Sequence, residues 1–406
     1  MHRFIQNRMC SRRKILTAGV SLAASAAGLQ LARGAAGLTD DQQHRREAVR
    51  RYLGKQHWKP RGCIYVPARA WNDYQTWRNY DPHEARRDIG FARRLGINAF
   101  RVWLSYEFWL HDADALLSHF NDFLTACAAA GIRVMPDLFE SDGVEPTKAN
   151  LNDTNPWTAS DVVSPATKVV NDKRLWGKPM EYVQWFMHHF GNDRRLLAIE
   201  VDNEPWAPWR MIFAREVMRV ARRANGVVPL TVGGNRTAQS MYFLNDGIDI
   251  LQTHCNFPLT AAAVRNRIHG EITIPQMVLD MPIWMTEWQR LRPHGSGWGG
   301  GHLQGNAWQP DYRSMAPLVH HAEIGNFFWS LMLKPAWLLV QRHEGTISGV
   351  FHEDGRVWSN ADARAISQNP AFHAPELKAW PTWAHAIPRK LGLPVKIAGD
   401  TTQKSP

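Results

Sequence analysis

Two glutamates stand at the ends of strongly apolar stretches and are the first candidates for chemistry. The stretch Leu196–Asn203 runs into Glu204, and Pro282–Trp288 is a second apolar run that carries Glu287. A lone glutamate at a strand end is usually a solvated loop residue, but two on buried strands can face one bond. Retaining cleavage of a glycosidic bond needs two carboxyl groups roughly 5 to 5.5 Å apart, one as acid/base and one as nucleophile.

The elements that must position these glutamates alternate along the chain. Short β-branched or aromatic runs alternate with longer helical patterns, which predicts βα units and a parallel sheet. The predicted strands are Gly62–Val66, Asn98–Leu104, Arg133–Phe139, Leu196–Asn203, Pro229–Gly233, Asp249–His254, Pro282–Trp288 and Phe327–Met332. The predicted helices are Glu84–Leu95, Ala113–Ala130, Pro179–Phe190, Trp209–Ala224, Leu259–Ile268 and Asp311–Ile324.

Eight such units predict an α/β fold of the (β/α)8 TIM-barrel class, whose βα loops form the catalytic face. The first strand is not followed by the glycine-rich phosphate loop that an open doubly wound sheet would favour. Long loops are expected at Glu140–Lys178, Gln289–Trp308 and Lys334–Val357. Indole faces suit pyranose rings, and we expect sugar binding from the group of tryptophans in or beside these loops, which are Trp157, Trp176, Trp298, Trp308, Trp337 and Trp358.

With these residues in place, the sequence resembles the barrel glycoside hydrolases of the clan that includes family 5, the cellulase and mannanase family. Asn203-Glu204-Pro205 is similar to the family's acid/base motif after the fourth strand, and Thr286-Glu287-Trp288 to its nucleophile motif on the seventh. The resemblance extends from about Gly62 to about Ile366. It implies a retaining hydrolase of β-linked glucan, mannan or xylan, with Glu204 as acid/base and Glu287 as nucleophile.

The same resemblance implies four supporting residues. Arg101 would hydrogen-bond Glu287 and keep it ionised. Asn203 would bind the sugar 2-hydroxyl. His254 matches the family's active-site histidine, and Trp329 its platform beneath the sugar.

Two positions depart from the family's pattern. The family usually has a tyrosine two residues after the histidine, and Asn256 stands there; its role is vacant or falls to Asn256, Tyr242 or Tyr312. Asp202 precedes Asn203, where the family usually has an apolar or aromatic residue. Asp202 either raises the pKa of Glu204 by like-charge repulsion or forms a salt bridge behind the strand.

The N-terminus predicts export. Arg12 and Arg13 precede an apolar run from Ile15 to Ala32, which is typical of a twin-arginine signal and favours a periplasmic or secreted protein; a membrane anchor is the alternative. The predicted segments are a signal over residues 1–37, the catalytic domain over 38–375 and a tail over 376–406. Much of the net charge of +11 lies in the signal, so no nucleic acid partner is expected.

Other functional classes find little support. No His-Glu-x-x-His motif, CxxC pair or Gly-x-Ser-x-Gly elbow occurs, so we expect neither a metal, nor a cofactor, nor a serine hydrolase. The expected partner is an oligo- or polysaccharide, with no membrane contact after signal cleavage and an open oligomeric state. A non-catalytic carbohydrate-binding protein on a degenerate barrel and a transglycosylase remain the alternatives.

Overall fold

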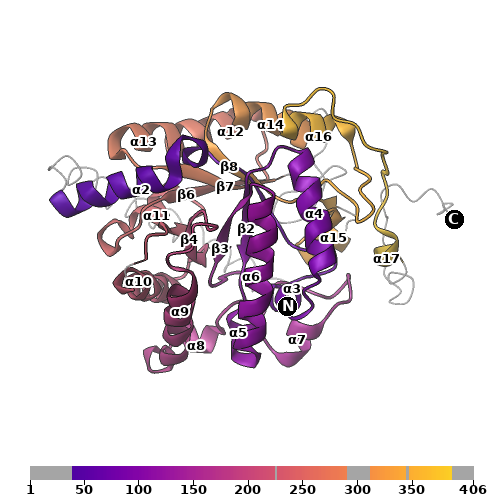
Figure 1. The fold of residues 1–406 in the computed structure, drawn as a ribbon. Helices are drawn as coiled ribbons and strands as arrows, with labels where there is room; N and C mark the ends of the chain where they lie inside the picture. The colour runs from indigo at the N-terminus through magenta and orange to yellow at the C-terminus, as the bar shows by residue number, and fades with distance from the viewer. Residues whose placement is uncertain (1–38, 225, 290–310, 344–346, 386–406) are drawn as a thin grey trace, which may run out of the picture.

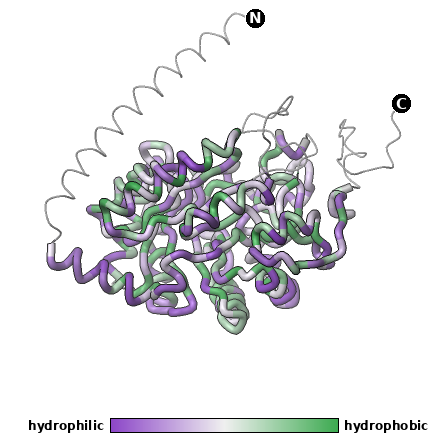
Figure 2. The backbone as a smooth tube through the Cα atoms, turned by 90° about the horizontal axis from the view of Figure 1, so that it is seen from above, coloured by the Kyte–Doolittle hydropathy of each residue, from purple (hydrophilic) through white to green (hydrophobic). Residues whose placement is uncertain are grey.

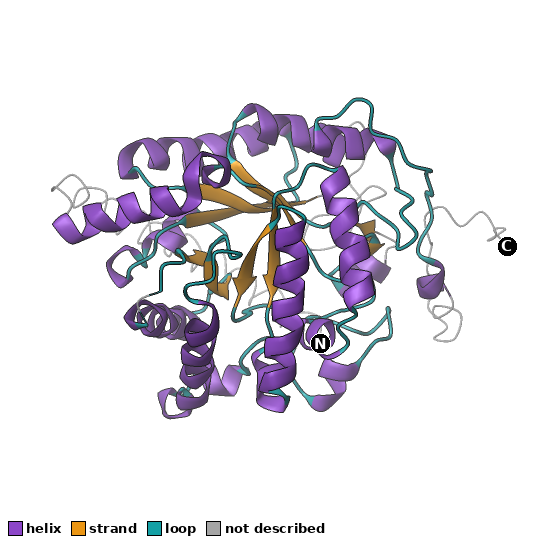
Figure 3. Cartoon of the chain, viewed as in Figure 1, coloured by secondary structure: helices purple, strands orange, loops and turns teal. Residues whose placement is uncertain are grey.

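Eight parallel strands form the centre of the molecule (Figures 1 and 3). The structure is a computed structural model that describes residues 39–224, 226–289, 311–343 and 347–385. The strands are β1 (Arg61–Ile64), β2 (Ala99–Trp103), β3 (Arg133–Asp137), β4 (Ile199–Asn203), β5 (Leu230–Gly233), β6 (Leu251–Asn256), β7 (Ile283–Gln289) and β8 (Gly325–Phe328). They pair in the order β5-β4-β3-β2-β1-β8-β7-β6, and a bridge between Thr231 and Ile250 joins the two outer strands. The predicted (β/α)8 barrel is therefore confirmed.

Helices surround this barrel, and all six predicted helices are present (Figure 3). Gly96 and Gly131, which the sequence marks as helix stops, both have positive φ angles just after a helix end. The described helices are α2 (Asp40–Trp58), α3 (Asp73–Arg78), α4 (Pro82–Arg94), α5 (Tyr106–His111), α6 (Ala113–Ala129), α7 (Lys148–Asn152), α8 (Thr167–Val170), α9 (Gly177–Phe190), α10 (Pro208–Arg223), α11 (Thr237–Met241), α12 (Ala261–Ile268), α13 (Ile274–Leu279), α14 (Tyr312–His321), α15 (Leu339–His343), α16 (Asn360–Ser367) and α17 (Thr382–His385), with short strands β9 (Lys334–Pro335) and β10 (Ile347–Ser348).

Near the amino ends of the strands, the barrel interior is filled with apolar side chains. One buried cluster joins side chains from six strands or their starts with two residues of α2, and consists of Val49, Leu53, Ala99, Met135, Leu197, Ala198, Ile250, Trp284 and Phe327. A Cβ at Gly62 would lie 2.1 Å from the Phe327 ring, so only glycine leaves room for that ring. The mostly hydrophilic helix α2 buries only Val49 and Leu53 of its length, both in this cluster (Figure 2). An apolar layer therefore lies next to the buried ion pair of Arg101 and Glu200 inside the barrel.

The long loops at the carboxyl ends of the strands have their own structure. The loop over residues 140–178 contains α7 and α8, and the loop over 334–357 contains α15 and the β9–β10 pair. Most of the third predicted loop, residues 290–310, lies outside the described residues, as do Trp298 and Trp308. Of the remaining loop tryptophans, Trp157 and Trp176 are buried, whereas Trp337 and Trp358 are partly exposed.

The segment and domain boundaries stay a prediction. The predicted signal over residues 1–37 lies outside the described residues, and so does most of the predicted tail. Where the tail is described, Trp380 stacks on Trp157 with ring centroids 5.1 Å apart. Among the described helices, none is both long and apolar enough to cross a membrane.

Candidate active site

The alternation of side chains is interrupted in the strands that carry the two glutamates. In β4, Glu200 faces the barrel interior, and regular alternation would also turn Asp202 inward. The pairing of β4 with β5 instead shifts register between Glu200 and Asn203. The pairing of β7 with β8 shifts between Met285 and Trp288. Such bulges re-aim side chains next to active sites.

Because of the second shift, Thr286 and Glu287 both contact interior groups although they are adjacent in sequence. At the end of β4, Glu204 itself has a φ of 45°. This left-handed conformation costs an ordinary residue about 1 to 2 kcal/mol. It turns the Glu204 side chain toward His254 on β6.

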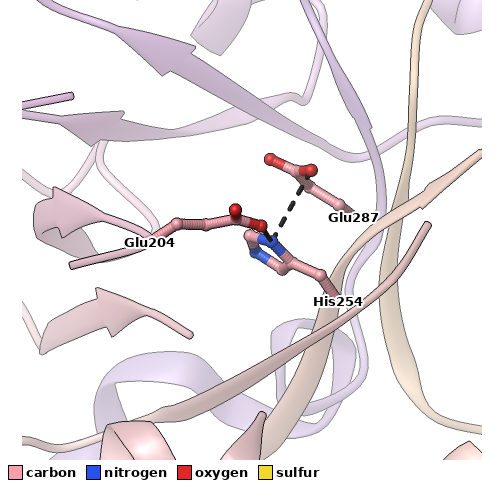
Figure 4. Close-up of side chains that lie close together, drawn as sticks. All are labelled: Glu204, His254 and Glu287. Atoms are coloured by element: carbon pink, nitrogen blue, oxygen red, sulfur yellow. Dashed lines mark hydrogen bonds and ion pairs between the residues drawn. The ribbon is translucent and has the colours of Figure 1, made fainter. Parts of the chain in front are cut away.

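The two glutamates meet at one histidine (Figure 4). His254 Nδ1 is hydrogen-bonded to Glu204 Oε1 and lies 3.6 Å from Glu287 Oε2. One ligand atom from each of the three side chains can be chosen so that all lie within 4.8 Å of one another. All three residues are buried, with exposed fractions of 6%, 2% and 5% for Glu204, His254 and Glu287. The predicted pair is therefore brought together at the carboxyl ends of β4 and β7.

Arg101 is the ionic centre below this pair. Its side chain is fully buried and stacks over the Trp103 ring at 4.6 Å. Arg101 Nη1 donates to Glu287 Oε1 at 2.7 Å, which is the contact predicted from the sequence. Burial alone would lower the pKa of Arg101, but its ion pairs, above all with Glu200, outweigh burial and raise that pKa.

Glu200 is a site residue that sequence reasoning missed. It accepts two hydrogen bonds from Arg101, at 2.7 and 2.6 Å, and is fully buried. A Cβ at Gly233 would lie 2.1 Å from Glu200 Oε1, so glycine at the end of β5 makes room for this pair. The signal was available, because a charged residue inside an apolar strand needs a buried partner.

Asn203 joins Arg101 to a second missed carboxylate, Glu140. Its Oδ1 accepts from Arg101 Nη2 at 2.7 Å, and its Nδ2 lies 3.1 and 3.0 Å from the two oxygens of Glu140. Glu140 follows the apolar strand β3 as Glu204 follows β4, which was its signal in the sequence. The contact of Asn203 with a sugar hydroxyl stays a prediction.

Asn256, which stands where the family 5 pattern has a tyrosine, contacts Glu287. Its Nδ2 donates to Glu287 Oε2 at 2.8 Å. Within the described part of the chain, its buried Oδ1 has no hydrogen-bond partner. Tyr312 instead donates to the Trp329 carbonyl, and Tyr242 is exposed. Of the three residues considered from the sequence, Asn256 contacts Glu287.

Asp202 adopts the second of its two predicted roles. It forms a salt bridge with Arg210 on α10, with Arg210 Nε 3.0 Å from Asp202 Oδ2. Burial raises the pKa of Asp202 to about 7, against the opposing effect of Arg210. Asp202 therefore serves the packing of α10 on β4 and does not face Glu204.

The protonation of Glu204 depends on His254 and Asp142. Burial alone would raise the pKa of Glu204, but the charge of His254 and its hydrogen bond outweigh burial and leave that pKa lowered. Burial would likewise lower the pKa of His254, but Glu287 and Glu204 outweigh it and raise the pKa. The charge of Glu204 also raises the pKa of Asp142, an exposed residue in the loop after β3. His254 is thus the hydrogen-bond partner that the geometry gives to Glu204.

Trp329 lies beside this group in an aromatic wall. Its ring is edge-on to Trp103 at 5.6 Å and to Trp337 at 5.4 Å between centroids. The peptide bond after Trp329 is cis. Only 6% of Trp329 is exposed, so the ring is firmly packed, and its contact with a sugar stays a prediction.

A metal ion would compete with existing partners at this site. The spacing of Glu204, His254 and Glu287 is one that an ion could bridge. However, the Arg101 guanidinium already donates to Glu287, and His254 Nδ1 already bonds Glu204. The donor set therefore favours proton chemistry.

The comparisons with known proteins give structural matches alone. No protein-family model matches the sequence, and no curated protein matches it. The fold is similar to the exo-β-1,4-mannosidase Op5Man5 from Opitutaceae bacterium strain TAV5, with a TM-score of 0.53 and 16% identity. That match covers 76% of this chain and 58% of Op5Man5, so this chain spans well under two thirds of that protein.

Two further structures have the same barrel. The hyperthermostable endo-1,4-β-D-mannanase from Thermotoga petrophila RKU-1 matches with a TM-score of 0.52 and 12% identity, over 76% of this chain and 98% of that chain. GH5_18 from Streptomyces cattleya, in complex with GlcNAc, matches with a TM-score of 0.52 and 14% identity, over 79% of this chain and 83% of that one. The predicted resemblance to the family 5 barrel is therefore confirmed as a likeness of fold.

Proposed function

We propose that this protein is a retaining glycoside hydrolase that cleaves β-linked glycans with Glu204 as acid/base and Glu287 as nucleophile. The observation that carries the proposal is the meeting of the two glutamates at His254, with carboxylate oxygens within 4.8 Å of each other. This spacing is close to the separation at which the second carboxylate acts as a nucleophile, and it is shorter than inverting enzymes need.

The reaction proceeds in two displacements. Glu287, held by Arg101 and Asn256, attacks the anomeric carbon while Glu204 gives a proton to the leaving oxygen, and a covalent glycosyl-enzyme forms. Water then enters, Glu204 takes its proton, and the bond to Glu287 breaks with release of the sugar. This second step leaves Glu204 protonated and Glu287 ionised, as at the start, with His254 still bonded to Glu204.

A β-mannoside is the first substrate class to test. Two of the structural neighbours are described as a mannosidase and a mannanase, and another is described with GlcNAc bound. The fold does not separate mannan from glucan or xylan, so a panel of chromogenic β-glycosides and insoluble polysaccharides is required. Turnover of one panel member separates an enzyme from a non-catalytic binding protein, and product analysis at high acceptor concentration separates a hydrolase from a transglycosylase.

The decisive experiment combines two variants with azide. Glu287→Ala should abolish turnover, and azide should then yield the α-glycosyl azide from a β-glycoside, because azide fills the place of the nucleophile. Glu204→Ala should slow substrates with poor leaving groups by about 10²- to 10⁴-fold, and azide should yield the β-glycosyl azide. Glu181→Ala, an exposed glutamate on α9, is the control. Full activity of Glu287→Ala, or inversion at the anomeric carbon in the wild type, contradicts the proposal.

We also propose that the chain is exported through the twin-arginine pathway to the periplasm or medium, because Arg12 and Arg13 precede the apolar run in the predicted signal. Replacing both arginines with lysine should retain the protein in the cytoplasm. Fractionation and N-terminal sequencing of the exported protein test both the route and the cleavage site. Export that continues unchanged in the double variant would exclude this route.

A further inference from the structure

A buried chain of hydrogen bonds runs from His254 away from the catalytic pair. His254 Nε2 lies 3.1 Å from Thr286 Oγ1, and Thr286 Oγ1 bonds Gln252 Oε1. Gln252 Nε2 donates to Thr231 Oγ1 at 2.9 Å, and Thr231 Oγ1 donates to the Ile250 carbonyl at 2.8 Å. Thr231, Gln252 and Thr286 are each fully buried.

The end of this chain fixes its direction. The carbonyl of Ile250 can only accept, so the hydroxyl of Thr231 donates its one proton to it. The Thr231 oxygen then accepts a hydrogen bond from Gln252. The amide oxygen of Gln252 then faces Thr286, which must donate to it. Toward His254, Thr286 Oγ1 can then only accept a hydrogen bond. The ring nitrogen of His254 that faces it, Nε2, must therefore carry a proton.

The opposite direction fits worse. It would turn the Thr231 proton away from the Ile250 carbonyl and reverse the amide of Gln252. A buried carbonyl would lose that donor, and leaving a buried acceptor unsatisfied is unfavourable. The observed direction satisfies each link of the chain.

We infer that Gln252 and Thr286 are positioning residues that fix the tautomer of His254, so that Nδ1 holds the proton of Glu204 during the reaction. With Nε2 protonated, Nδ1 either accepts from the neutral carboxyl of Glu204 or carries a second proton that it donates to the carboxylate. One proton is thus stored in the Glu204–His254 bond, directly beside the leaving group. This inference rests on the proposed function and deepens it.

Several charged groups face the stored proton. Glu204 reaches His254 from β4, Glu287 from β7 and Arg101 from β2, and Asp142 contacts Glu204 from the loop after β3. None of them belongs to the chain through Thr286. Substitutions along that chain therefore change the support of His254 Nε2 without altering the charges around the pair.

The first test is the pH dependence of kcat/KM. Thr286→Val keeps the shape of the side chain but removes the acceptor, so the protonated pair loses a charge-assisted hydrogen bond. The alkaline limb, where the pair loses its proton, should move down by about one pH unit. Thr286→Ser restores the hydroxyl and should restore the limb. Gln252→Met should shift the limb in the same direction, and the double variant no further, because the residues act in series.

The second test reads the tautomer without activity. In protein with 15N-labelled histidine, with His254 assigned by comparison with His254→Asn, the wild-type ring should be protonated at Nε2 at all pH values. In Thr286→Val the neutral ring should carry its proton at Nδ1. Thr237→Val, a buried threonine bonded to the Glu271 carbonyl, is the matched control and should change neither readout.

Each outcome decides the inference. A wild-type neutral ring protonated at Nδ1 overturns it, and so does an unchanged alkaline limb in folded Thr286→Val. If no glycoside is turned over at all, the proposed function fails, yet the NMR measurement still decides whether the chain sets the tautomer of His254.

Discussion

Asn256 offers the sharpest test of how Glu287, the proposed nucleophile, is held. Glu287 has two donors from the described chain, Arg101 at 2.7 Å and Asn256 at 2.8 Å. Asn256→Ala removes one of them, and hydrogen bonds to charged groups contribute about 1.5 to 3 kcal/mol. Arg101 remains and keeps the carboxylate in place, so we expect the low end of that range, which corresponds to roughly tenfold in kcat/KM.

Asn256→Asp should differ from Asn256→Ala in how its activity depends on pH. It places a carboxylate where the amide donated, about 2.8 Å from Glu287 Oε2, so the two acids repel each other at neutral pH. Above neutral pH, Asn256→Asp should be less active than Asn256→Ala. Its activity should recover as the pH is lowered, because a proton shared by the two carboxylates again provides a hydrogen-bond donor to Glu287. Steady-state kinetics between pH 4 and 9 on an aryl β-glycoside measure both variants. Activity within twofold of wild type in both folded variants would refute a role of Asn256 at the nucleophile.

Three further outcomes follow from the geometry. Glu200→Gln breaks a fully buried ion pair with Arg101 and should destabilise the protein by about 3 kcal/mol, seen as a melting temperature lower by roughly 6 °C; an unchanged melting temperature would mean that Arg101 does not depend on Glu200. Burial raises the pKa of Glu107 to about 7. The folded state therefore binds this proton between about pH 4 and 7, and stability is lost as the pH rises through that window. The melting temperature should be higher at pH 5 than at pH 8, and Glu107→Gln should reduce that difference. Trp329→Ala should raise KM severalfold by removing the packed indole face, whereas Trp329→Phe should keep most of the affinity; equal KM values in the two variants would remove Trp329 from the binding surface.

The barrel was predictable because its signals are local. Each strand is a short apolar run, and the helices between them have regular apolar spacing with glycine stops such as Gly96 and Gly131. Arg101 and Glu287 were predictable for a related reason, because a charge within an apolar run has to find a partner inside the barrel. The same argument applied to Glu200 would have found the partner of Arg101.

The remainder of the site depends on register, which local patterns do not give. Regular alternation would turn Asp202 inward, and it would put only one of Thr286 and Glu287 inside. Bulges in β4 and β7 change both outcomes. Gln252 and Thr286 are ordinary strand residues in composition, and only the pairing of β6 with β7 brings Thr286 into contact with both Gln252 and His254. Asp142 lies in a loop, where spacing along the chain says little about its distance from Glu204.

The ionic layer of the barrel is best explained by positioning. An apolar layer of similar volume in place of Arg101 and Glu200 would often be as stable or more stable, since burying both charges costs desolvation energy. The layer below, around Trp284 and Phe327, consists of uncharged, apolar side chains. Charged side chains occur in the layer where Arg101 donates to Glu287. Glu200 binds the other nitrogens of the Arg101 guanidinium and balances its charge. On this reasoning Glu200→Gln should loosen Glu287 as well as the fold, so activity should be lost well below the melting temperature of that variant.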